Sequence, residues 1–342
     1  MRSIRHLEET EGVNSVGTLL EIRDLKVSFD TEEGKVEALD GVNLKVKEGE
    51  FHALIGETGC GKTVTGLTIL GLLDNNAKIE NGQVIYKGID LLKLTEKQLQ
   101  QQIRGKEITM IFQDPSTSLD PIFTIEEQML EALENELELT KEEKLKIITE
   151  ELRKVKLPDV EELLKKYPHQ LSGGMKQRVM IAMMLSCRPS LLIADEPTTA
   201  LDVSTQAQFL KILEDLKRET KITAIYITHN LAVVSEICDT VSVMYAGRIV
   251  ETASLKEIFL NPQHPYTYKL LHSVLGIETD IEQLQEIPGS VPKLINPPSG
   301  CRFHPRCEEA KDICKTKIPK LQEISDGHFV ACHKRVMEWT KC

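Results

Sequence analysis

The sequence lacks several features that would place it in common functional classes. It has no basic excess, because 53 acidic and 42 basic side chains give a formal net charge of −11. That charge argues against general nucleic-acid binding, which needs a basic surface, and against docking on anionic lipid through charge alone. No stretch approaches the ~20 consecutive apolar residues that span a bilayer. Residues 1–18 are mostly polar and carry several glutamates, unlike a secretory signal. We therefore expect a soluble intracellular protein.

What the sequence has is a globular composition, with 41% hydrophobic residues in a chain of 342. Strand-like and helix-like segments alternate, which predicts a parallel α/β sheet. Before it, residues 19–50 predict a small antiparallel sheet, and residues of about 125–185 predict a helical insertion. No internal repeat of the 20–50-residue type is visible. The strands expected for the parallel sheet and its neighbours are 51–55, 82–86, 108–112, 191–195, 225–228 and 241–245.

Three helices are predicted with a defined inward face. The helix after residue 63 places Val64, Leu67, Leu70 and Leu73 at intervals of three. A capping box of Thr140 and Glu143 precedes a second helix, in which apolar residues recur on one side. That side comprises Leu145, Ile148, Leu152 and Val155, and the third helix turns Phe209, Ile212, Leu213 and Leu216 inward.

Residues 56–63 read Gly-Glu-Thr-Gly-Cys-Gly-Lys-Thr, which is the spacing of a phosphate-binding P-loop. Glycines let successive backbone N–H groups point inward, and the following helix directs its positive end at the phosphates. Lys62 would reach the β- and γ-phosphates, and the Thr63 hydroxyl would ligate Mg²⁺. The alternative is a chance glycine-rich turn, which the strand before and the helix after disfavour.

Two further segments fit a nucleotide site. Asp195 and Glu196 end an apolar strand, where the first would hold Mg²⁺ and the second would act as general base toward water. The alternative for this pair is a solvated rim. Ser172-Gly173-Gly174 opens a helix and so offers a second phosphate-binding end, although alone this tripeptide is more often an ordinary turn and N-cap.

Together these motifs resemble the ATPase subunit of an ATP-binding cassette (ABC) transporter. The P-loop, Leu-Ser-Gly-Gly at 171–174, Ala-Asp-Glu-Pro-Thr-Thr-Ala-Leu-Asp at 194–202 and Thr-His-Asn at 228–230 occur in the family's order. The likeness covers residues 19–262. It implies an α/β fold of the P-loop NTPase class: a cassette ATPase core with an antiparallel β subdomain, an inserted helical subdomain of about 114–190, and a small loop-rich C-terminal module at 263–342 that contains cysteines.

The resemblance also implies roles for single residues. Gln113 is similar to the glutamine that contacts Mg²⁺ and water, and His229 to the switch histidine that contacts the γ-phosphate. Asp202 matches the D-loop, and Asn230 replaces the usual aspartate after the histidine. Phe29 occupies the position of an aromatic that stacks on adenine, although it is also explained as a core strand residue. The expected ATP contacts are Phe29, Gly56, Gly59, Cys60, Gly61, Lys62, Thr63, Val64, Gln113, Ser172, Gly173, Gly174, Asp195, Asp202 and His229.

The implied mechanism is hydrolysis at shared sites. Each ATP lies between one subunit's P-loop and the opposing subunit's Ser172 and Gly174. Glu196 and His229 align water, while Lys62 and Mg²⁺ neutralise charge. Mg²⁺ is expected on Thr63, Gln113 and Asp195.

The segment after residue 262 points to a subfamily. It is rich in proline, and its motifs at 264–267, 288–292 and 300–307 resemble the extension of dipeptide and oligopeptide importer ATPases, specifically their D-type subunit. The spacing Cys301-x5-Cys307-x6-Cys314-x17-Cys332 lacks the tight pair of a structural zinc site. The resemblance favours a [4Fe–4S] cluster on these four cysteines, and zinc or free thiols are the alternatives.

The expected partners follow from this resemblance. They are a second ATPase subunit (a heterodimer, with a homodimer as the other option), two transmembrane permease subunits and, indirectly, an extracytoplasmic peptide-binding protein, with no nucleic acid. The expected location is the cytoplasmic face of the membrane. A nickel importer is the alternative substrate class. Soluble cassette ATPases of translation or DNA repair are disfavoured by the single cassette, the short interval between Lys62 and Ser172, and the acidic charge.

Overall fold

The computed structural model describes residues 17–113, 119–134, 138–199, 202–274, 287 and 289–339. They divide into two compact units. Unit 1 lies within residues 94–225, and unit 2 comprises the described residues of 17–93 and 226–339. Among all the described residues, no helix is long and apolar enough to cross a membrane.

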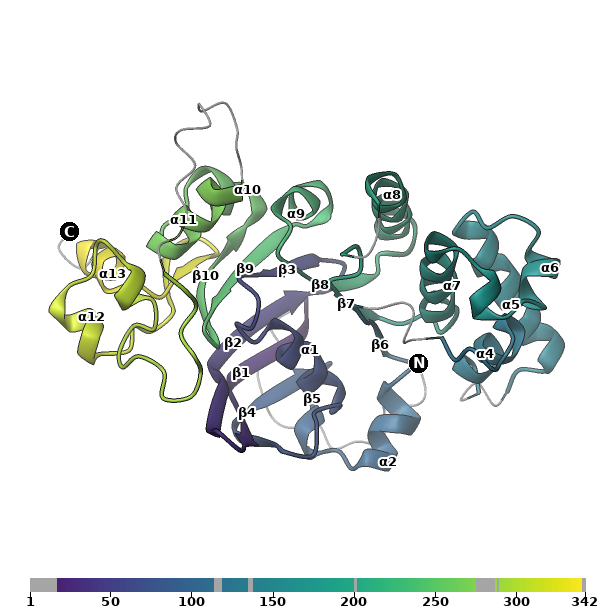
Figure 1. Ribbon diagram of the computed structural model, residues 1–342, viewed down its shortest axis with the longest axis horizontal. Coiled ribbons are helices and arrows are strands. Elements are labelled where there is room, and N and C mark those ends of the chain that lie inside the picture. The colour runs from purple at the N-terminus through teal and green to yellow at the C-terminus, as the bar shows by residue number, and fades with distance from the viewer. Residues whose placement is uncertain are drawn as a thin grey trace. The chain divides into compact units, whose positions relative to one another are not determined.

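Unit 2 begins with an antiparallel sheet in the order β2-β1-β4-β5 (Figure 1). Along β2, buried Val42, Leu44 and Val46 alternate with exposed neighbours, the two-residue period of a sheet with one buried face. The antiparallel sheet predicted for residues 19–50 is therefore confirmed. Its strands are β1 (Thr18–Thr31), β2 (Gly34–Lys47), β4 (Ala77–Tyr86) and β5 (Ile89–Asp90), followed by the 3₁₀ turn η1 (Leu91–Lys93).

A second set of strands in unit 2 carries the P-loop. The strand β3 (Phe51–Ile55) is buried at every residue and pairs in parallel with β9 (Thr240–Tyr245). The antiparallel neighbour of β9 is β10 (Arg248–Ser254), followed outward by β12 (His328–Val330) and β11 (Gln322–Ser325). Helix α1 (Lys62–Leu70) follows β3, so the strand, loop and helix predicted for the P-loop are all present.

The buried face of α1 differs from the predicted one. Leu70 is buried, but Val64 and Leu67 are only half-buried, and the helix ends before Leu73. Thr65 and Thr68 are buried instead, because their hydroxyls donate to backbone carbonyls one turn earlier, at 3.0 and 2.7 Å. A threonine whose hydroxyl is hydrogen-bonded can take the place of an aliphatic residue in a core.

Unit 1 combines parallel strands with the helical insertion. The strand β6 (Ile108–Ile111) pairs in parallel with β7 (Leu191–Asp195), and β8 (Thr223–Thr228) contains the division between the units. The predicted capping box of Thr140 and Glu143 is present, and the predicted inward face of the helix after residue 202 is buried. The helical elements are α2 (Glu96–Gln98), η2 (Leu99–Ile103), α4 (Ile125–Ala132), α5 (Lys141–Lys154), α6 (Val160–Leu164), η3 (Pro168–Gln170), α7 (Gly173–Ser186) and α8 (Val203–Thr220).

The segment after residue 262, which we call the C-terminal extension, is joined to the P-loop strands in unit 2. Its strand β12 pairs with β10 through Glu251 and Val330. The buried Glu251 carboxylate accepts hydrogen bonds from His328 at 2.7 Å and from the backbone N–H groups of Gln263 and His264 at 2.7 and 2.8 Å. The remaining elements of unit 2 are short: α9 (Leu231–Ile237), α10 (Leu255–Leu260), α11 (Pro265–Val274), η5 (His304–Arg306), α12 (Asp312–Thr316) and α13 (His333–Trp339).

Candidate functional site

The P-loop in unit 2 adopts a backbone path that needs glycine. Gly56 and Gly61 have φ angles of +151° and +105°. A Cβ on Gly56 would lie 2.1 Å from the Met244 carbonyl oxygen, and one on Gly61 would lie 2.8 Å from the Ala38 carbonyl oxygen. Both contacts are with backbone atoms, which cannot rotate away. Strand residues on each side therefore exclude any side chain at these two positions.

Lys62 and Thr63 begin helix α1 directly after the loop. The Lys62 side chain is buried, and its ammonium donates to the carbonyls of Gly56 and Glu57 at 2.8 and 3.1 Å. Thr63 is exposed. The N-cap is Gly61, so no side chain occupies the amide groups of the first turn. This arrangement gives an anion a positive helix end, a lysine and a hydroxyl at adjacent positions.

The other predicted ATP residues of unit 2 vary in exposure. Phe29 on β1 is half-buried, which leaves part of its ring available, and His229 is exposed between β8 and α9. Asn230 acts as the N-cap of α9, with its side chain accepting from the Ala232 N–H at 3.1 Å. Cys60 is buried, and burial raises the pKa of its thiol. The Cys60 thiol is thus protonated at neutral pH.

Unit 1 brings together two of the predicted catalytic residues. The Gln113 amide donates to Glu196 Oε2 at 3.3 Å, and Thr199 Oγ1 donates to the same oxygen at 3.1 Å. Asp195, the last residue of β7, is 3% exposed. Glu196 has a φ of +44°, which is uncommon for a residue with a side chain and occurs preferentially at functional sites.

Ser172, Gly173 and Asp202 lie at helix starts in unit 1. Ser172 is the N-cap of α7 and accepts from the Met175 N–H at 3.3 Å, while Ser172 and Gly173 are both exposed. Asp202 is the N-cap of α8 and accepts from the Thr205 N–H at 2.9 Å. The 14-residue helix α7 therefore presents its positive end at the surface, where a phosphate of another molecule can reach it.

Two residues of the C-terminal extension contact the P-loop at Glu57, and the sequence motifs assign a role to none of the three. Glu57, a variable position of the motif, binds Arg306 through its carboxylate, and its N–H donates to the Tyr266 hydroxyl at 3.0 Å. Both partners belong to the C-terminal extension. They lie in the motifs His-Pro-Tyr-Thr and Cys-Arg-Phe-His-Pro-Arg-Cys. These motifs mark the two residues as part of the family's extension, but nothing in the sequence links them to Glu57.

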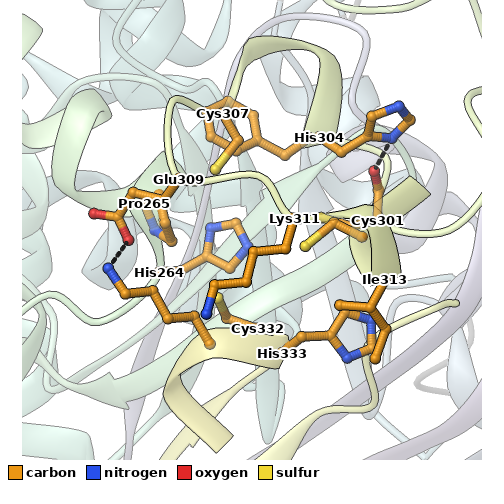
Figure 2. A pocket seen from close by; sticks show the side chains of 13 residues that line it. His264, Pro265, Cys301, His304, Cys307, Glu309, Lys311, Ile313, Cys332 and His333 are labelled. Carbon is orange, nitrogen blue, oxygen red and sulfur yellow. Dashed lines mark hydrogen bonds and ion pairs between the residues drawn. The ribbon is translucent and has the colours of Figure 1, made fainter. Parts of the chain in front are cut away.

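The four cysteines of the extension line one cavity of about 250 Å³. Figure 2 shows Cys301, Cys307 and Cys332 around this cavity, and Cys314 also lines it. Burial raises the pKa of Cys301 and of Cys307 to about 11, so both thiols keep their protons at neutral pH. Among the described residues, however, no group of three or more His, Cys, Asp or Glu side chains is placed to hold a metal ion. The predicted metal site thus finds no support in the side-chain positions.

Comparison with known proteins agrees with this geometry. Residues 39–199 match the ABC transporter family, and residues 250–314 match the C-terminal region of oligopeptide and dipeptide transporters. The probable peptide ABC transporter ATP-binding protein y4tR of Sinorhizobium fredii is 50% identical over 316 residues, which cover 92% of this chain and 94% of that protein. The chain belongs to the ATP-binding proteins of oligopeptide and dipeptide ABC transporters.

Other members of this family match over similar lengths. The oligopeptide transport protein OppD of Escherichia coli is 45% identical, with 94% of each chain covered. The dipeptide transport protein DppD of Bacillus subtilis is also 45% identical, with 92% of this chain and 94% of that one covered. These relatives favour the peptide-importer assignment over the nickel-importer and soluble-ATPase alternatives.

A solved structure supports the same fold and activity. The ATP-binding cassette MJ0796, in a dimeric post-hydrolysis state bound to ADP and Pi, is 30% identical with a TM-score of 0.62. The match covers 69% of this chain and 99% of that one. As a member of this family, the chain is an ATPase with the fold of an ABC nucleotide-binding domain.

Proposed function

We propose that this chain energises the import of dipeptides or oligopeptides by hydrolysing ATP at a site shared with a second ATPase subunit. The observation that carries the peptide assignment is the C-terminal extension, which matches the corresponding region of oligopeptide and dipeptide transporters. The observation that supports a shared site is the exposed helix start at Ser172 and Gly173. A nucleotide bound to a facing subunit would bring its phosphates to this surface.

We assign the binding steps to the P-loop. Its amides and Lys62 would hold the β- and γ-phosphates, because the lysine already lies over the loop carbonyls. Thr63, Gln113 and Asp195 would hold Mg²⁺, whose charge would stabilise the transferred phosphoryl group. Phe29, Cys60 and Val64 complete the proposed contacts around the nucleotide, and Gly174, Asp202 and His229 contact the γ-phosphate or the facing subunit.

We assign water activation to Glu196. Its hydrogen bonds from Gln113 and Thr199 and its unusual backbone conformation fix the direction of the carboxylate. A carboxylate held in this way can accept a proton from water and align it for in-line attack. His229, which is exposed after β8, would contact the γ-phosphate.

The proposed assembly places this chain at the cytoplasmic face of a membrane. Two permease subunits would span the bilayer, an extracytoplasmic binding protein would deliver the peptide, and a second ATPase subunit, different or identical, would complete the pair. We propose the cassette domain at 19–262, with its helical subdomain at about 114–190, and the extension at 263–342.

The function is tested with the reconstituted transporter. ATPase activity is measured with the permease partners and binding protein, with panels of dipeptides, longer peptides and nickel. Stimulation by peptides is the expected result. Stimulation by nickel alone would redirect the assignment to metal uptake, and stimulation by none of them would contradict an importer of either class.

We also propose a [4Fe–4S] cluster in the four-cysteine cavity, with zinc as the alternative. Each thiolate of such a cluster binds its own iron, so four thiols around one cavity fit a cluster better than convergence on a single ion. Binding would require loss of the protons that burial retains on Cys301 and Cys307. The test is purification without oxygen, followed by iron, sulfide and zinc analysis. A colourless, iron-free protein would contradict the cluster.

A further inference from the structure

Glu57 of the P-loop is held at each of its three polar groups. Its carbonyl accepts from Lys62 at 3.1 Å, its N–H donates to the Tyr266 hydroxyl at 3.0 Å, and its carboxylate pairs with Arg306. The first contact is internal to the loop. The other two come from the C-terminal extension, about two hundred residues further along the chain.

The Arg306 contact has the geometry of a strong ion pair. Nη1 lies 2.8 Å from Glu57 Oε2 and Nη2 lies 3.1 Å from Oε1, so two parallel bonds fix the carboxylate plane. The Arg306 side chain is 6% exposed, so water screens this pair weakly. Nη2 also donates to the carbonyls of Ile287 and Gly289, each at 3.2 Å. The extension therefore fixes the guanidinium, and the guanidinium fixes Glu57.

The Tyr266 contact is equally constrained. Its ring is fully buried, with its centroid 4.6 Å from that of Tyr245 and 5.4 Å from that of Phe303. Arg306 Nη1 donates to the Tyr245 hydroxyl at 3.3 Å. Tyr245 therefore contacts both residues that bind Glu57, Arg306 through its hydroxyl and Tyr266 through its ring. Tyr266 thus offers its hydroxyl oxygen to the Glu57 N–H from a rigid base.

These two contacts matter because the loop is rich in glycine. Gly56, Gly59 and Gly61 surround Glu57 in sequence, and glycine loses more conformational freedom on ordering than any other residue. A loop already ordered before ATP arrives does not lose that freedom on binding. Glu57 also provides one of the two loop carbonyls that accept from Lys62, so its position helps to place the ammonium.

We propose that the C-terminal extension preorganises the phosphate-binding loop, with Arg306 and Tyr266 acting as positioning residues through Glu57. Neither side chain needs to touch ATP. The extension then has a function in the nucleotide cycle in addition to any ligand held by its cysteines. The proposal rests on ATP binding by this family and not on the peptide assignment, so nucleotide binding tests it independently of transport.

The test compares three substitutions in the full chain. They are Arg306→Met, which removes the ion pair, Glu57→Gln, which weakens it from the other side, and Tyr266→Phe, which removes one hydroxyl and keeps the ring. Affinity for a fluorescent ATP analogue is measured on the subunit, and KM and kcat for ATP on the assembled transporter. We expect each variant to weaken binding and raise KM by about fivefold or more, with a smaller change in kcat.

Arg302→Met is the matched control. Arg302 is also a buried arginine of the extension, and it pairs with Glu37 at 2.5 Å and Asp40 at 3.2 Å, neither of which is in the loop. This variant should lower thermal stability while leaving the KM for ATP near the wild-type value. Arg306→Lys keeps the charge but can form only one of the two hydrogen bonds to Glu57. This variant should therefore bind ATP more tightly than Arg306→Met and more weakly than the wild type.

The double variant Arg306→Met with Glu57→Gln should bind ATP no more weakly than Arg306→Met alone, since both substitutions act on the same contact. An unchanged KM in Glu57→Gln and Tyr266→Phe would overturn the proposal. So would an equal rise in KM for Arg302→Met, because the effect would then follow stability alone. If Arg306→Met does not fold, the two milder variants still decide between these outcomes.

Discussion

Gln113 and Glu196 are joined by a hydrogen bond of 3.3 Å, although 83 residues separate them in the chain. The first follows strand β6 and the second follows its parallel neighbour β7. Because parallel strands end at the same edge of a sheet, residues that follow them come together there. The glutamine that the family resemblance links to Mg²⁺ thus directly contacts the proposed general base, so a change at either residue should reach the other.

We predict that Glu196→Gln retains ATP binding and lowers turnover by about 10²–10⁴-fold, since the amide cannot accept the proton of water. ATP should then hold two subunits together. The measurements are ATP hydrolysis and the oligomeric state with and without ATP, by size-exclusion chromatography.

The control for this variant is Glu214→Gln, an exposed carboxylate of α8 paired with Lys211 at the surface. It should leave turnover and oligomeric state unchanged. Near-normal hydrolysis in Glu196→Gln would remove Glu196 from the base role.

We predict that Gly61→Ala abolishes ATP binding and destabilises unit 2. The added Cβ would lie 2.7 Å from Leu39 and 2.8 Å from the Ala38 carbonyl oxygen, so either the loop or strand β2 must move. Gly105→Ala is the comparison, because Gly105 also has a positive φ, +72°, but open space around it. It should cost only the backbone strain of about 1–2 kcal/mol. Equal losses of stability in the two variants would show that the contacts of Gly61 do not matter.

The sequence predicted the elements of the nucleotide site well because each motif is local. The P-loop and its flanking strand and helix lie within about twenty residues, so the residues that bind phosphate are close together in the sequence. The inward face of α1 was predicted wrongly because Thr65 and Thr68 are buried through hydrogen bonds that a pattern of apolar residues does not reveal.

Long-range contacts could not be predicted in the same way. Arg306 and Glu57 are 249 residues apart, and no periodicity links them. The pairing of β12 with β10 was likewise not expected, since proline and loop character predicted a separate module after about residue 261. Both contacts depend on buried charged groups whose partners lie in distant segments.

We predict that His264 makes the protein less stable in mild acid. Burial lowers the pKa of His264 to about 4, with Arg335 acting in the same direction and Glu251 and Glu309 opposing it. The neutral ring accepts the Tyr266 N–H at Nδ1, at 3.0 Å. In the unfolded chain the pKa is about 6.5, so the unfolded state binds the extra proton between these values. The contribution of His264 to stability is therefore fully present above pH ~6.5. As the pH drops toward 4, the free energy of unfolding should fall by up to about 3 kcal/mol.

The measurement is urea unfolding at several pH values for the wild type and for His264→Gln, whose amide oxygen can still accept the same N–H. This variant should lose part of the pH dependence. His272→Gln, at an exposed histidine of α11, should retain all of it. An unchanged slope in His264→Gln would contradict the assignment.

We predict that Glu251→Gln detaches the C-terminal extension. The buried carboxylate accepts three hydrogen bonds, from His328 and from the N–H groups of Gln263 and His264. An amide would turn one acceptor oxygen into a donor that faces another donor in a buried site. The cost should be about 3–5 kcal/mol, as for other broken buried pairs.

Hydrogen exchange and limited proteolysis measure this detachment directly. In Glu251→Gln, protection should fall in β12 and around His264, while α5 in unit 1 keeps its protection. Glu308→Gln is the control, because its side chain is 77% exposed and, within the part of the chain that the structure describes, forms an ion pair with Lys269 alone. If the extension also holds the P-loop through Arg306, ATP affinity should fall with its protection in Glu251→Gln. Loss of protection without any loss of affinity would separate the docking of the extension from the positioning of the loop.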